Sequence, residues 1–216
     1  MPKKLAVLNH VKDNAVNERT NLGGSGGPEF DSGRIAFRRL QDSDMSLMLE
    51  WLNDPYLEQV YLGGRKTTMK EVTGKYMPRV EGKDPVSPYL ILYDGKHVGY
   101  IQSCMWSDYP DFSICLKKEE RNASGLDVFI GENSFRGKGF GPLMLKRFLK
   151  EVVFTRYNTD NCLVTPLMDN RIAIRAYEKA GFRKVRLLDH PDEQSALCLM
   201  AISRETAAAG GITSQQ

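Results

Sequence analysis

The sequence has few of the residues that bind metals or form disulfide bridges. Its 216 residues include four cysteines and three histidines. The cysteines lie far apart, with no CxxC pair and no nearby histidine pattern, at Cys104, Cys115, Cys162 and Cys198. We therefore predict no metal site and no disulfide framework, and we expect the reduced thiols that are usual in the cytoplasm.

Long apolar runs and a strong excess of one charge are also missing. No apolar stretch approaches the roughly 18 to 20 residues that cross a bilayer, and the N-terminus lacks the features of a signal peptide. The net charge is only +3, with 30 basic residues interspersed among 27 acidic ones, which argues against a nucleic-acid partner. We expect a cytoplasmic protein with no membrane or nucleic-acid partner.

The two ends of the chain differ from its centre. Residues 1–33 include the stretch NLGGSGGPEFDSG, which is typical of a flexible linker or of a junction between fused segments. Residues 204–216 have no periodic apolar face, and we expect a loose C-terminal tail there. Residues 34–203 are predicted to form the folded domain.

Within residues 34–203 the patterns predict the order β-α-α-β-β-β-α-β-α-β-β. Two apolar runs flank Asp94-Gly95, the signal of a β-hairpin with a type I′ turn. Thr68 and Glu71 have capping-box spacing. Amphipathic helices are predicted over residues 139–155 and from residue 170 to a stop at Gly181. Strands alternating with helices in this order predict an α/β fold with a mixed sheet.

The stretch DVFIGENSFRGKGFGPLMLKRFLKEVVF, residues 127–154, contains a glycine-rich basic turn between a strand and a helix. Glycines before a helix N-terminus let several N–H groups converge on an anion, above all a pyrophosphate. The turn is neither a Walker loop nor a dinucleotide fingerprint, because Gly137, Gly139 and Gly141 have GxGxG spacing. Taken alone, it is equally well explained as a flexible basic surface loop.

Arg136, Gly139 and Gly141 form an RxxGxG pattern that resembles the acetyl-CoA pyrophosphate motif of the GNAT N-acetyltransferases. The later stretch NRIAIRAYEKAGF resembles the second signature of that family. There the asparagine, here Asn170, binds the cofactor region, and the tyrosine, here Tyr177, stands near the sulfur of coenzyme A. Without the first motif, Tyr177 would be an ordinary tyrosine on a core face.

The resemblance covers residues 34–203 and implies the GNAT fold, an α/β (α+β) architecture. In this fold helices flank a mixed, mostly antiparallel central sheet that is splayed where acetyl-CoA binds. It also implies acetyl-CoA as the cofactor, with direct transfer to the acceptor in a ternary complex. The residues implied in cofactor binding are Val128, Phe129, Ile130, Arg136, Gly137, Lys138, Gly139, Phe140, Gly141, Asn170, Ala173 and Tyr177.

Further stretches sharpen the resemblance to the aminoglycoside 6′-N-acetyltransferases. They are MLEWLNDPYLEQVYLGG, KYMPRV, SPYLILYDGKHVGYIQS, GLDVFIGENSFRGKGFG and AIRAYEKAGF. The resemblance implies that the partner is an aminoglycoside, that its 6′-amino group is acetylated and that resistance follows. We expect a monomer or a weak homodimer.

An amine that is protonated at pH 7 must lose a proton before it attacks a thioester. Asp127 is the candidate base, because Leu126, Val128 and Ile130 share one face of its strand while Asp127 takes the other. The resemblance places it in the active site and makes Tyr177 the acid that protonates the leaving sulfur. A structural aspartate with a buried partner is the alternative.

A polycationic acceptor predicts an acidic pocket. Candidate substrate-binding residues are Tyr76, Glu119, Glu120, Asp127, Asp192 and Glu193, although each acid alone is more often a solvated surface charge and Tyr76 a core residue. Two positions depart from the resembled enzymes. Thr165 stands where an acid commonly precedes the proline, and Tyr61-Leu62 replace paired tryptophans.

Two other functions stay open at this stage. The protein could acetylate a different small-molecule amine, such as a siderophore precursor, or a protein amine. It could also be a non-catalytic acyl-CoA-binding module, although the combination of Asp127, Asn170 and Tyr177 argues against this.

Overall fold

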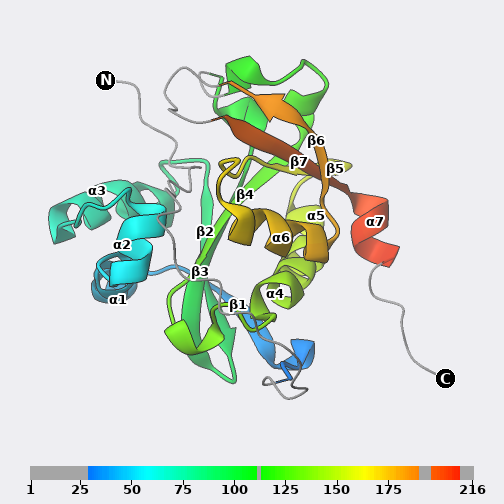
Figure 1. Cartoon of the computed structure of the whole chain (residues 1–216). Helices are drawn as coiled ribbons and strands as arrows, with labels where there is room; N and C mark the ends of the chain where they lie inside the picture. The colour runs from blue at the N-terminus through cyan, green and yellow to red at the C-terminus, as the bar shows by residue number, and fades with distance from the viewer. Residues whose placement is uncertain (1–28, 111–112, 190–195, 210–216) are drawn as a thin grey trace.

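Seven strands form one sheet in the order β1-β2-β3-β4-β5-β7-β6 (Figure 1). This computed structural model describes residues 29–110, 113–189 and 196–209. All neighbouring strands are antiparallel except β4 and β5, which are parallel. The strands are β1 (Ile35–Arg39), β2 (Ser87–Tyr93), β3 (Lys96–Met105), β4 (Ser124–Ile130), β5 (Asn161–Val164), β6 (Arg183–Leu188) and β7 (Leu197–Ser203). The predicted mixed, mostly antiparallel sheet is confirmed.

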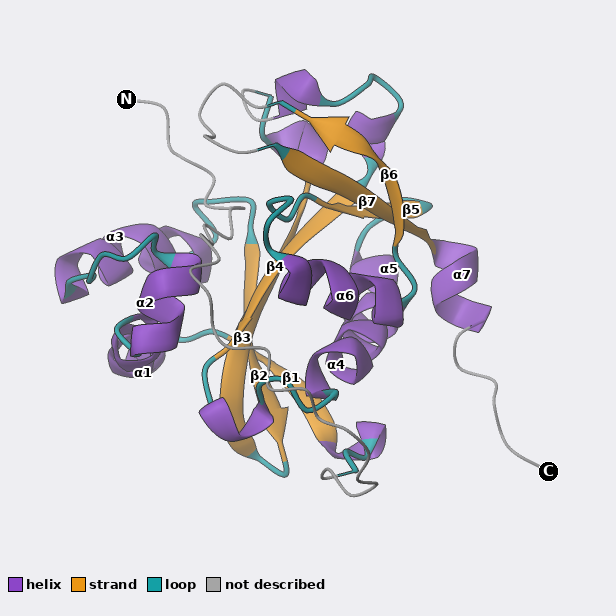
Figure 2. Ribbon diagram, viewed as in Figure 1, coloured by secondary structure: helices purple, strands orange, loops and turns teal. Residues whose placement is uncertain are grey.

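Helices cover both faces of this sheet (Figure 2). One face carries α1 (Met45–Leu52), α2 (Pro55–Tyr61) and α3 (Met69–Val80), and the other carries α4 (Phe140–Phe148) and α6 (Arg171–Ala180). Strand alternation divides the core accordingly. Leu90 and Tyr100 pack with α1–α3, whereas Ile91 and Ile101 pack with α4 and α6.

The sheet splays open between β4 and β5. The two strands pair at only two positions, Ser124 with Cys162 and Gly125 with Leu163. On the other side, β4 pairs with β3 along its whole length, from Ser124 to Ile130. Residues 126–130 therefore present an edge of β4 that no β5 residue covers, as the resemblance implied.

Most predicted elements are confirmed. Asp94 and Gly95 form the β2–β3 turn with positive φ angles of 49° and 74°. The helix expected over 139–155 consists of α4, a π-helical turn (Leu149–Val153) and α5 (Phe154–Arg156). The helix α6 ends at Gly181, whose φ is 110°. The capping box of Thr68 and Glu71 begins α3.

Three segments differ from expectation. Helix α2 was not predicted, although Asp54 caps it and Pro55 occupies its first position, a favoured helix start. Residues 204–209 form α7 (Arg204–Ala209), where we expected the beginning of a loose tail. Phe30, assigned to the leader, packs against Tyr93 and Phe140. Ser32 and Gly33 of the leader belong to a short 3-10 helix (Ser32–Arg34), and residues 1–28 lie outside the described residues.

The end of β4 is held by the indole of Trp51 in α1. Its Nε1 donates to Glu132 Oε1 at 2.9 Å, and a Cβ at Gly131 would lie only 2.3 Å from Trp51 Cδ2. Gly131 therefore allows the α1 side chain to lie directly against the backbone next to the glycine-rich turn.

We expect Gly131→Ala to lower the free energy of unfolding by about 1–3 kcal/mol, because the added methyl overlaps the buried indole. Gly74→Ala is the control, since nothing lies within 4 Å of a Cβ there, in helix α3. It should instead stabilise the protein by about 0.5–1 kcal/mol. Chemical denaturation measures both, and equal effects of the two substitutions would contradict this account of Gly131.

Candidate active site

A cavity of ≈ 350 Å³ lies at the open edge of β4. Its walls come from α2 (Tyr56, Leu57, Val60 and Tyr61), from β4, from the glycine turn with the start of α4, and from α6. Of the implied cofactor residues, it is lined by Val128, Phe129, Ile130, Arg136, Gly137, Gly139, Gly141, Asn170, Ala173 and Tyr177. The volume is in the usual range of small-molecule sites.

The glycine turn presents unpaired backbone donors to this cavity. Within the described residues, the amides of residues 137–139 donate no hydrogen bond, and α4 begins at Phe140. Gly137 and Gly139 have φ angles of 70° and 89°, and a Cβ on either would meet no atom within 4 Å. Open space in front of free N–H groups at a helix start is the geometry that binds a pyrophosphate.

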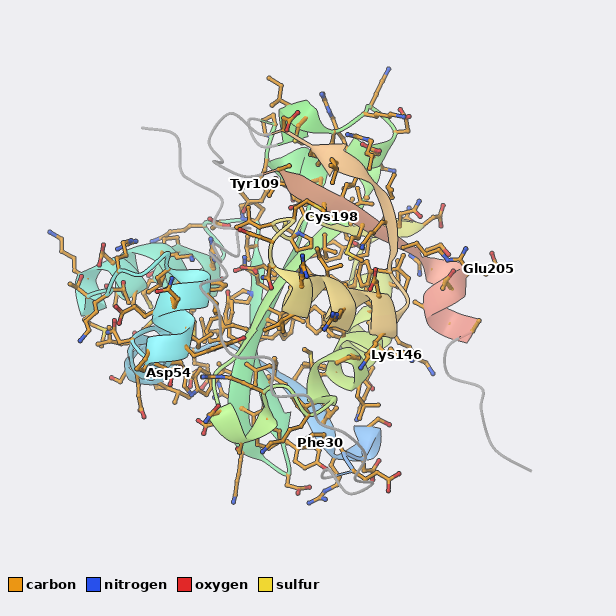
Figure 3. All side chains as sticks on the ribbon, viewed as in Figure 1. Phe30, Asp54, Tyr109, Lys146, Cys198 and Glu205 are labelled. Carbon is orange, nitrogen blue, oxygen red and sulfur yellow. The ribbon has the colours of Figure 1, made fainter. Side chains whose placement is uncertain are left out.

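The two basic side chains of the turn, Arg136 and Lys138, do not both point into the cavity as their position in the motif had suggested. Arg136 lines the wall, but its guanidinium is held by the carbonyls of Ile130 and Gly131 and by Asp54 at 2.7 Å. Asp54 lies at the start of α2 (Figure 3). Lys138 is exposed and outside the cavity wall. The Phe140 side chain is fully buried, so only its backbone can take part in binding.

Helix α6 supplies the opposite wall. Asn170 caps it by accepting from the Ala173 amide at 3.0 Å. Tyr177 is 3% exposed and lines the cavity, and burial raises its pKa, so its phenol stays protonated. Arg175 and Lys179 also line this wall. Sequence analysis missed both, although a basic pair four residues apart next to the tyrosine is a readable signal for binding phosphates.

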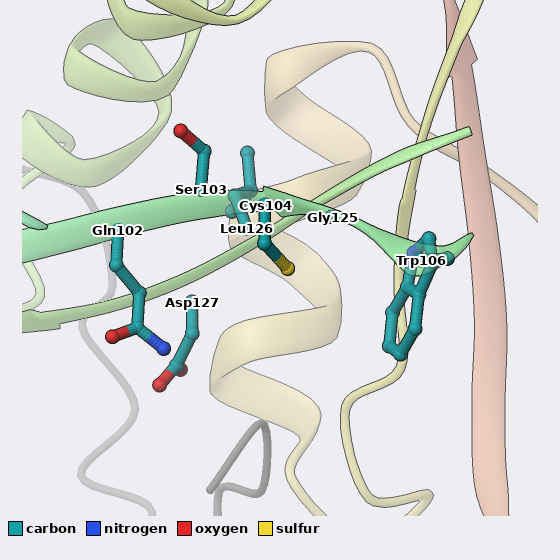
Figure 4. A pocket seen from close by; sticks show the side chains of 7 residues that line it. All are labelled: Gln102, Ser103, Cys104, Trp106, Gly125, Leu126 and Asp127. Atoms are coloured by element: carbon teal, nitrogen blue, oxygen red, sulfur yellow. The ribbon is translucent and has the colours of Figure 1, made fainter. Parts of the chain in front are cut away.

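Asp127 lies behind the cavity rather than on its wall. It is 3% exposed, and its two carboxylate oxygens accept from the Tyr61 hydroxyl at 2.5 Å and from the Val128 amide at 2.9 Å. It projects to the same side of the sheet as its cross-strand neighbour Gln102 (Figure 4). Burial raises the pKa of Asp127, opposed chiefly by the Tyr61 hydrogen bond and by the charge of Lys75.

Tyr61 therefore connects the cavity with the buried carboxylate. It was noted in the sequence only as a departure from paired tryptophans. Its hydrogen bond to Asp127 joins residues 66 positions apart, which no local pattern reveals. The structure thus shows Asp127 as a buried aspartate with a partner, and its role in the active site stays a prediction.

The other candidate substrate residues that the structure describes, Tyr76, Glu119 and Glu120, do not line the cavity. Tyr76 is fully buried and packs against Tyr100 at 5.3 Å between ring centres. Glu120 forms an ion pair with Arg186 of β6, and Glu119 is exposed before β4; neither lines the cavity. Asp192 and Glu193 lie outside the described residues. Substrate contact by these residues stays a prediction.

The resembled enzymes commonly have an acidic residue at the position of Thr165, and the nearest acid here is Asp169. Neither Thr165 nor Asp169 lies where it could contact a ligand in the cavity. Thr165 is 3% exposed, and its hydroxyl has no hydrogen-bond partner among the described residues. Asp169, four residues later, likewise has one buried carboxylate oxygen without a partner in this part of the chain. Neither residue lines the cavity.

Three of the four cysteines, Cys104, Cys162 and Cys198, are buried. Within the described ranges no group of His, Cys, Asp and Glu side chains is arranged to hold a metal ion. No described helix is long and apolar enough to cross a membrane. Burial raises the pKa of the Cys162 thiol to about 12 and that of Cys104 still further, so both stay protonated and are poor nucleophiles.

Comparison with known proteins agrees with this geometry. Residues 41–190 match the family described as "Acetyltransferase (GNAT) domain". An aminoglycoside N(6')-acetyltransferase type 1 from Klebsiella pneumoniae is 29% identical over 160 residues, which are 73% of this chain and 78% of the relative. The N(6)-hydroxylysine O-acetyltransferase of Escherichia coli is 22% identical over 157 residues, 73% of this chain and 48% of that protein.

Solved structures show the same likeness. The crystal structure of aminoglycoside acetyltransferase AAC(6')-Ib in complex with coenzyme A and kanamycin matches with a TM-score of 0.72 at 25% identity. The match covers 81% of this chain and 98% of that chain.

We expect Gly139→Ala to raise the dissociation constant of coenzyme A about tenfold, equivalent to about 1.4 kcal/mol. The substitution strains a φ of 89° and places a methyl in the open space before the free amides. Gly82→Ala is the matched control, because Gly82 has a φ of 73° and equally open surroundings but lies outside the cavity wall. Calorimetric titration measures both, and an equal loss of affinity in the two variants would show that strain alone is responsible.

Proposed function

The chain belongs to the GNAT acetyltransferase family, and from this premise we propose that it acetylates the 6′-amino group of aminoglycoside antibiotics. Its cofactor is acetyl-CoA, with which proteins of the same fold have been crystallised. The observation that carries the proposal is that Tyr61 and Tyr177 line one cavity, with the buried Asp127 hydrogen-bonded to Tyr61 behind its wall. Acetylation removes the positive charge of the amine, and we propose antibiotic resistance as the consequence.

We propose direct transfer in a ternary complex. Acetyl-CoA supplies the acetyl group as a thioester when bound. The free amides of residues 137–139 and the start of α4 would hold its pyrophosphate, and Arg175 and Lys179 add positive charge from the α6 wall of the same cavity. The exposed edge of β4, from Val128 to Ile130, would orient the rest of the acetyl-CoA molecule, including its thioester.

The acceptor amine is mostly protonated at pH 7 and has to lose a proton before it attacks. Asp127 is buried, whereas Tyr61 lines the cavity and donates to it at 2.5 Å. The proton would pass from the amine to the Tyr61 oxygen while the Tyr61 proton moves to Asp127. Tyr61 is neutral before and after this relay, and Asp127 becomes the protonated acid.

Tyr177 is the proposed acid for the leaving sulfur. Its raised pKa keeps the phenol protonated at neutral pH, and its ring is held edge-on by Phe182 at 5.4 Å between centres. A non-catalytic acyl-CoA-binding module would have no use for a buried carboxylate on one wall and a protonated phenol on the other, which favours an enzyme.

The position of transfer is tested with kanamycin B and kanamycin C, which carry an amine or a hydroxyl at the 6′ position on otherwise matching rings. A thiol-release assay with acetyl-CoA should report rapid turnover of kanamycin B and at least about a hundredfold less of kanamycin C. Equal turnover would move the reaction to another amine. Binding of acetyl-CoA without any turnover would support the binding module instead.

The pH dependence tests the base. Because the pKa of Asp127 is raised above the ordinary value of about 3.9, kcat/KM should be lost as the pH falls through that raised value. Asp127→Asn should lower kcat by about 10²–10⁴-fold without changing coenzyme A binding. Tyr61→Phe removes a hydrogen bond that lowers the pKa of Asp127, so any remaining activity should lose its acid limb at higher pH.

The control for these variants is Tyr109→Phe. The Tyr109 hydroxyl also donates to a carboxylate, that of Asp84 at 2.7 Å, but neither residue lines the cavity. Its pH profile should match the wild type. Wild-type kcat in Asp127→Asn would exclude Asp127 as the base.

A further inference from the structure

Lys75 of α3 does not itself line the cavity, but its ammonium group lies against Tyr61, which does. We call Tyr61, Asp127 and Lys75 the acceptor side of the site. Its Nζ atom lies 5.3 Å from the centre of the Tyr61 ring and 5.1 Å from that of Tyr76. The Tyr61 hydroxyl donates to Asp127. Cation, phenol and carboxylate therefore follow one another from α3 through α2 to β4.

Two other cations, Arg65 and Arg79, lie close enough for their charges to act on Lys75, and both already have carboxylate partners. Arg65 pairs with Glu71 at 2.9 Å. Arg79 is buried, donates to Gln102 at 2.6 Å and lies 3.9 Å from Asp84. In the described part of the chain, Lys75 has aromatic faces in place of an acid. Its ammonium is thus free to donate to a ligand oxygen.

The charges of this region act on one another. Burial, and after it the charge of Arg79, lowers the pKa of Lys75 to about 7. Lys75 and Arg79 in turn lower the pKa of Asp127. The other titratable groups whose charges couple to Asp127 are phenols, namely Tyr61, Tyr76, Tyr100 and Tyr177.

The charged side chains described around Tyr61 are Lys75, Arg79 and Asp127, which is a different arrangement from the acidic pocket that a polycation would need. Among the described residues, the proposed base Asp127 is the buried carboxylate that Tyr61 contacts, and Lys75 lies on the ring of that same Tyr61. If the acceptor carried a second ammonium group near Lys75, the two positive charges would repel each other in a poorly solvated place. An acceptor oxygen at the same position can instead accept a hydrogen bond from the Lys75 ammonium.

We propose that Lys75 determines acceptor specificity by selecting amines that carry a hydrogen-bond-accepting oxygen, and not a second ammonium, near the reacting amine. This inference rests on the proposed function, because it concerns the acceptor of the same reaction. It narrows the aminoglycosides to those whose reacting ring carries no second amine.

Kanamycin A and kanamycin B test it, because both have the 6′-amine but carry a hydroxyl or an amine at the 2′ position of the same ring. Wild-type protein should have a kcat/KM about tenfold higher for kanamycin A. Lys75→Met keeps the length of the side chain and removes its charge. It should bring the two values within about twofold, mainly by lowering the KM for kanamycin B.

Lys70→Met is the matched control, since Lys70 is exposed on the same helix, and it should keep the wild-type preference. A second measurement separates charge from packing. Lys75→Met should move the acid limb of kcat/KM for kanamycin A to higher pH, because the charge of Lys75 lowers the pKa of Asp127. A change of shape alone would leave that limb in place.

The outcomes distinguish this inference from the proposed function. Turnover of both kanamycins with the same preference in wild type and Lys75→Met would overturn the role of Lys75 and leave the proposed function standing. A gain in kcat/KM for kanamycin B that exceeds any gain for kanamycin A in Lys75→Met would support the role of Lys75. If both proteins bind acetyl-CoA but acetylate neither kanamycin, the proposed acceptor and the inference both fail.

Discussion

The site depends on the incomplete pairing of β4. This strand is hydrogen-bonded to β3 from end to end but to β5 at only two positions. Full pairing fixes where β4 lies, and incomplete pairing leaves residues 126–130 with an uncovered edge. Unpaired strand edges are normally avoided because they attract other chains. Here the walls formed by α2, α4 and α6 enclose that edge in a cavity, so the exposed backbone becomes part of a binding site.

Two halves of the site are built in different ways. The cofactor half is largely backbone: the free amides of the glycine turn, the start of α4 and the edge of β4. Such a half constrains few side-chain identities beyond the glycines. The proposed acceptor half is made of side chains, with Tyr61 from α2, Lys75 and Arg79 from α3, and Asp127 from β4. Substitutions on α2 and α3 can therefore change the acceptor while the cofactor site stays the same.

This division explains how much could be predicted from the sequence. The glycine turn and the helix with Asn170 and Tyr177 are local patterns, and the structure brings them to one cavity. Helix α2 has seven residues and was missed, and with it one wall of the cavity. The contact between Tyr61 and Asp127 depends on how α2 packs over β4. Arg136 shows the opposite case, because its position in the motif suggested a phosphate ligand whereas its guanidinium binds Asp54 and two carbonyls.

Burial and nearby charge act in opposite directions on the pKa of Asp127, and this gives Lys75 a use beside the proposed amine site. A carboxylate that is 3% exposed would tend to take up a proton and lose its function as a base. The Tyr61 hydroxyl, the Val128 amide and the charge of Lys75 all favour the ionised form. Removal of Lys75 would relieve repulsion toward cationic acceptors. It would also raise the pKa of Asp127, so that a smaller fraction of this carboxylate is ionised at a given pH. In the proposed mechanism the same lysine thus links the ionisation of Asp127 to the charge of the acceptor, so that acceptor range and the pH dependence of catalysis would change together.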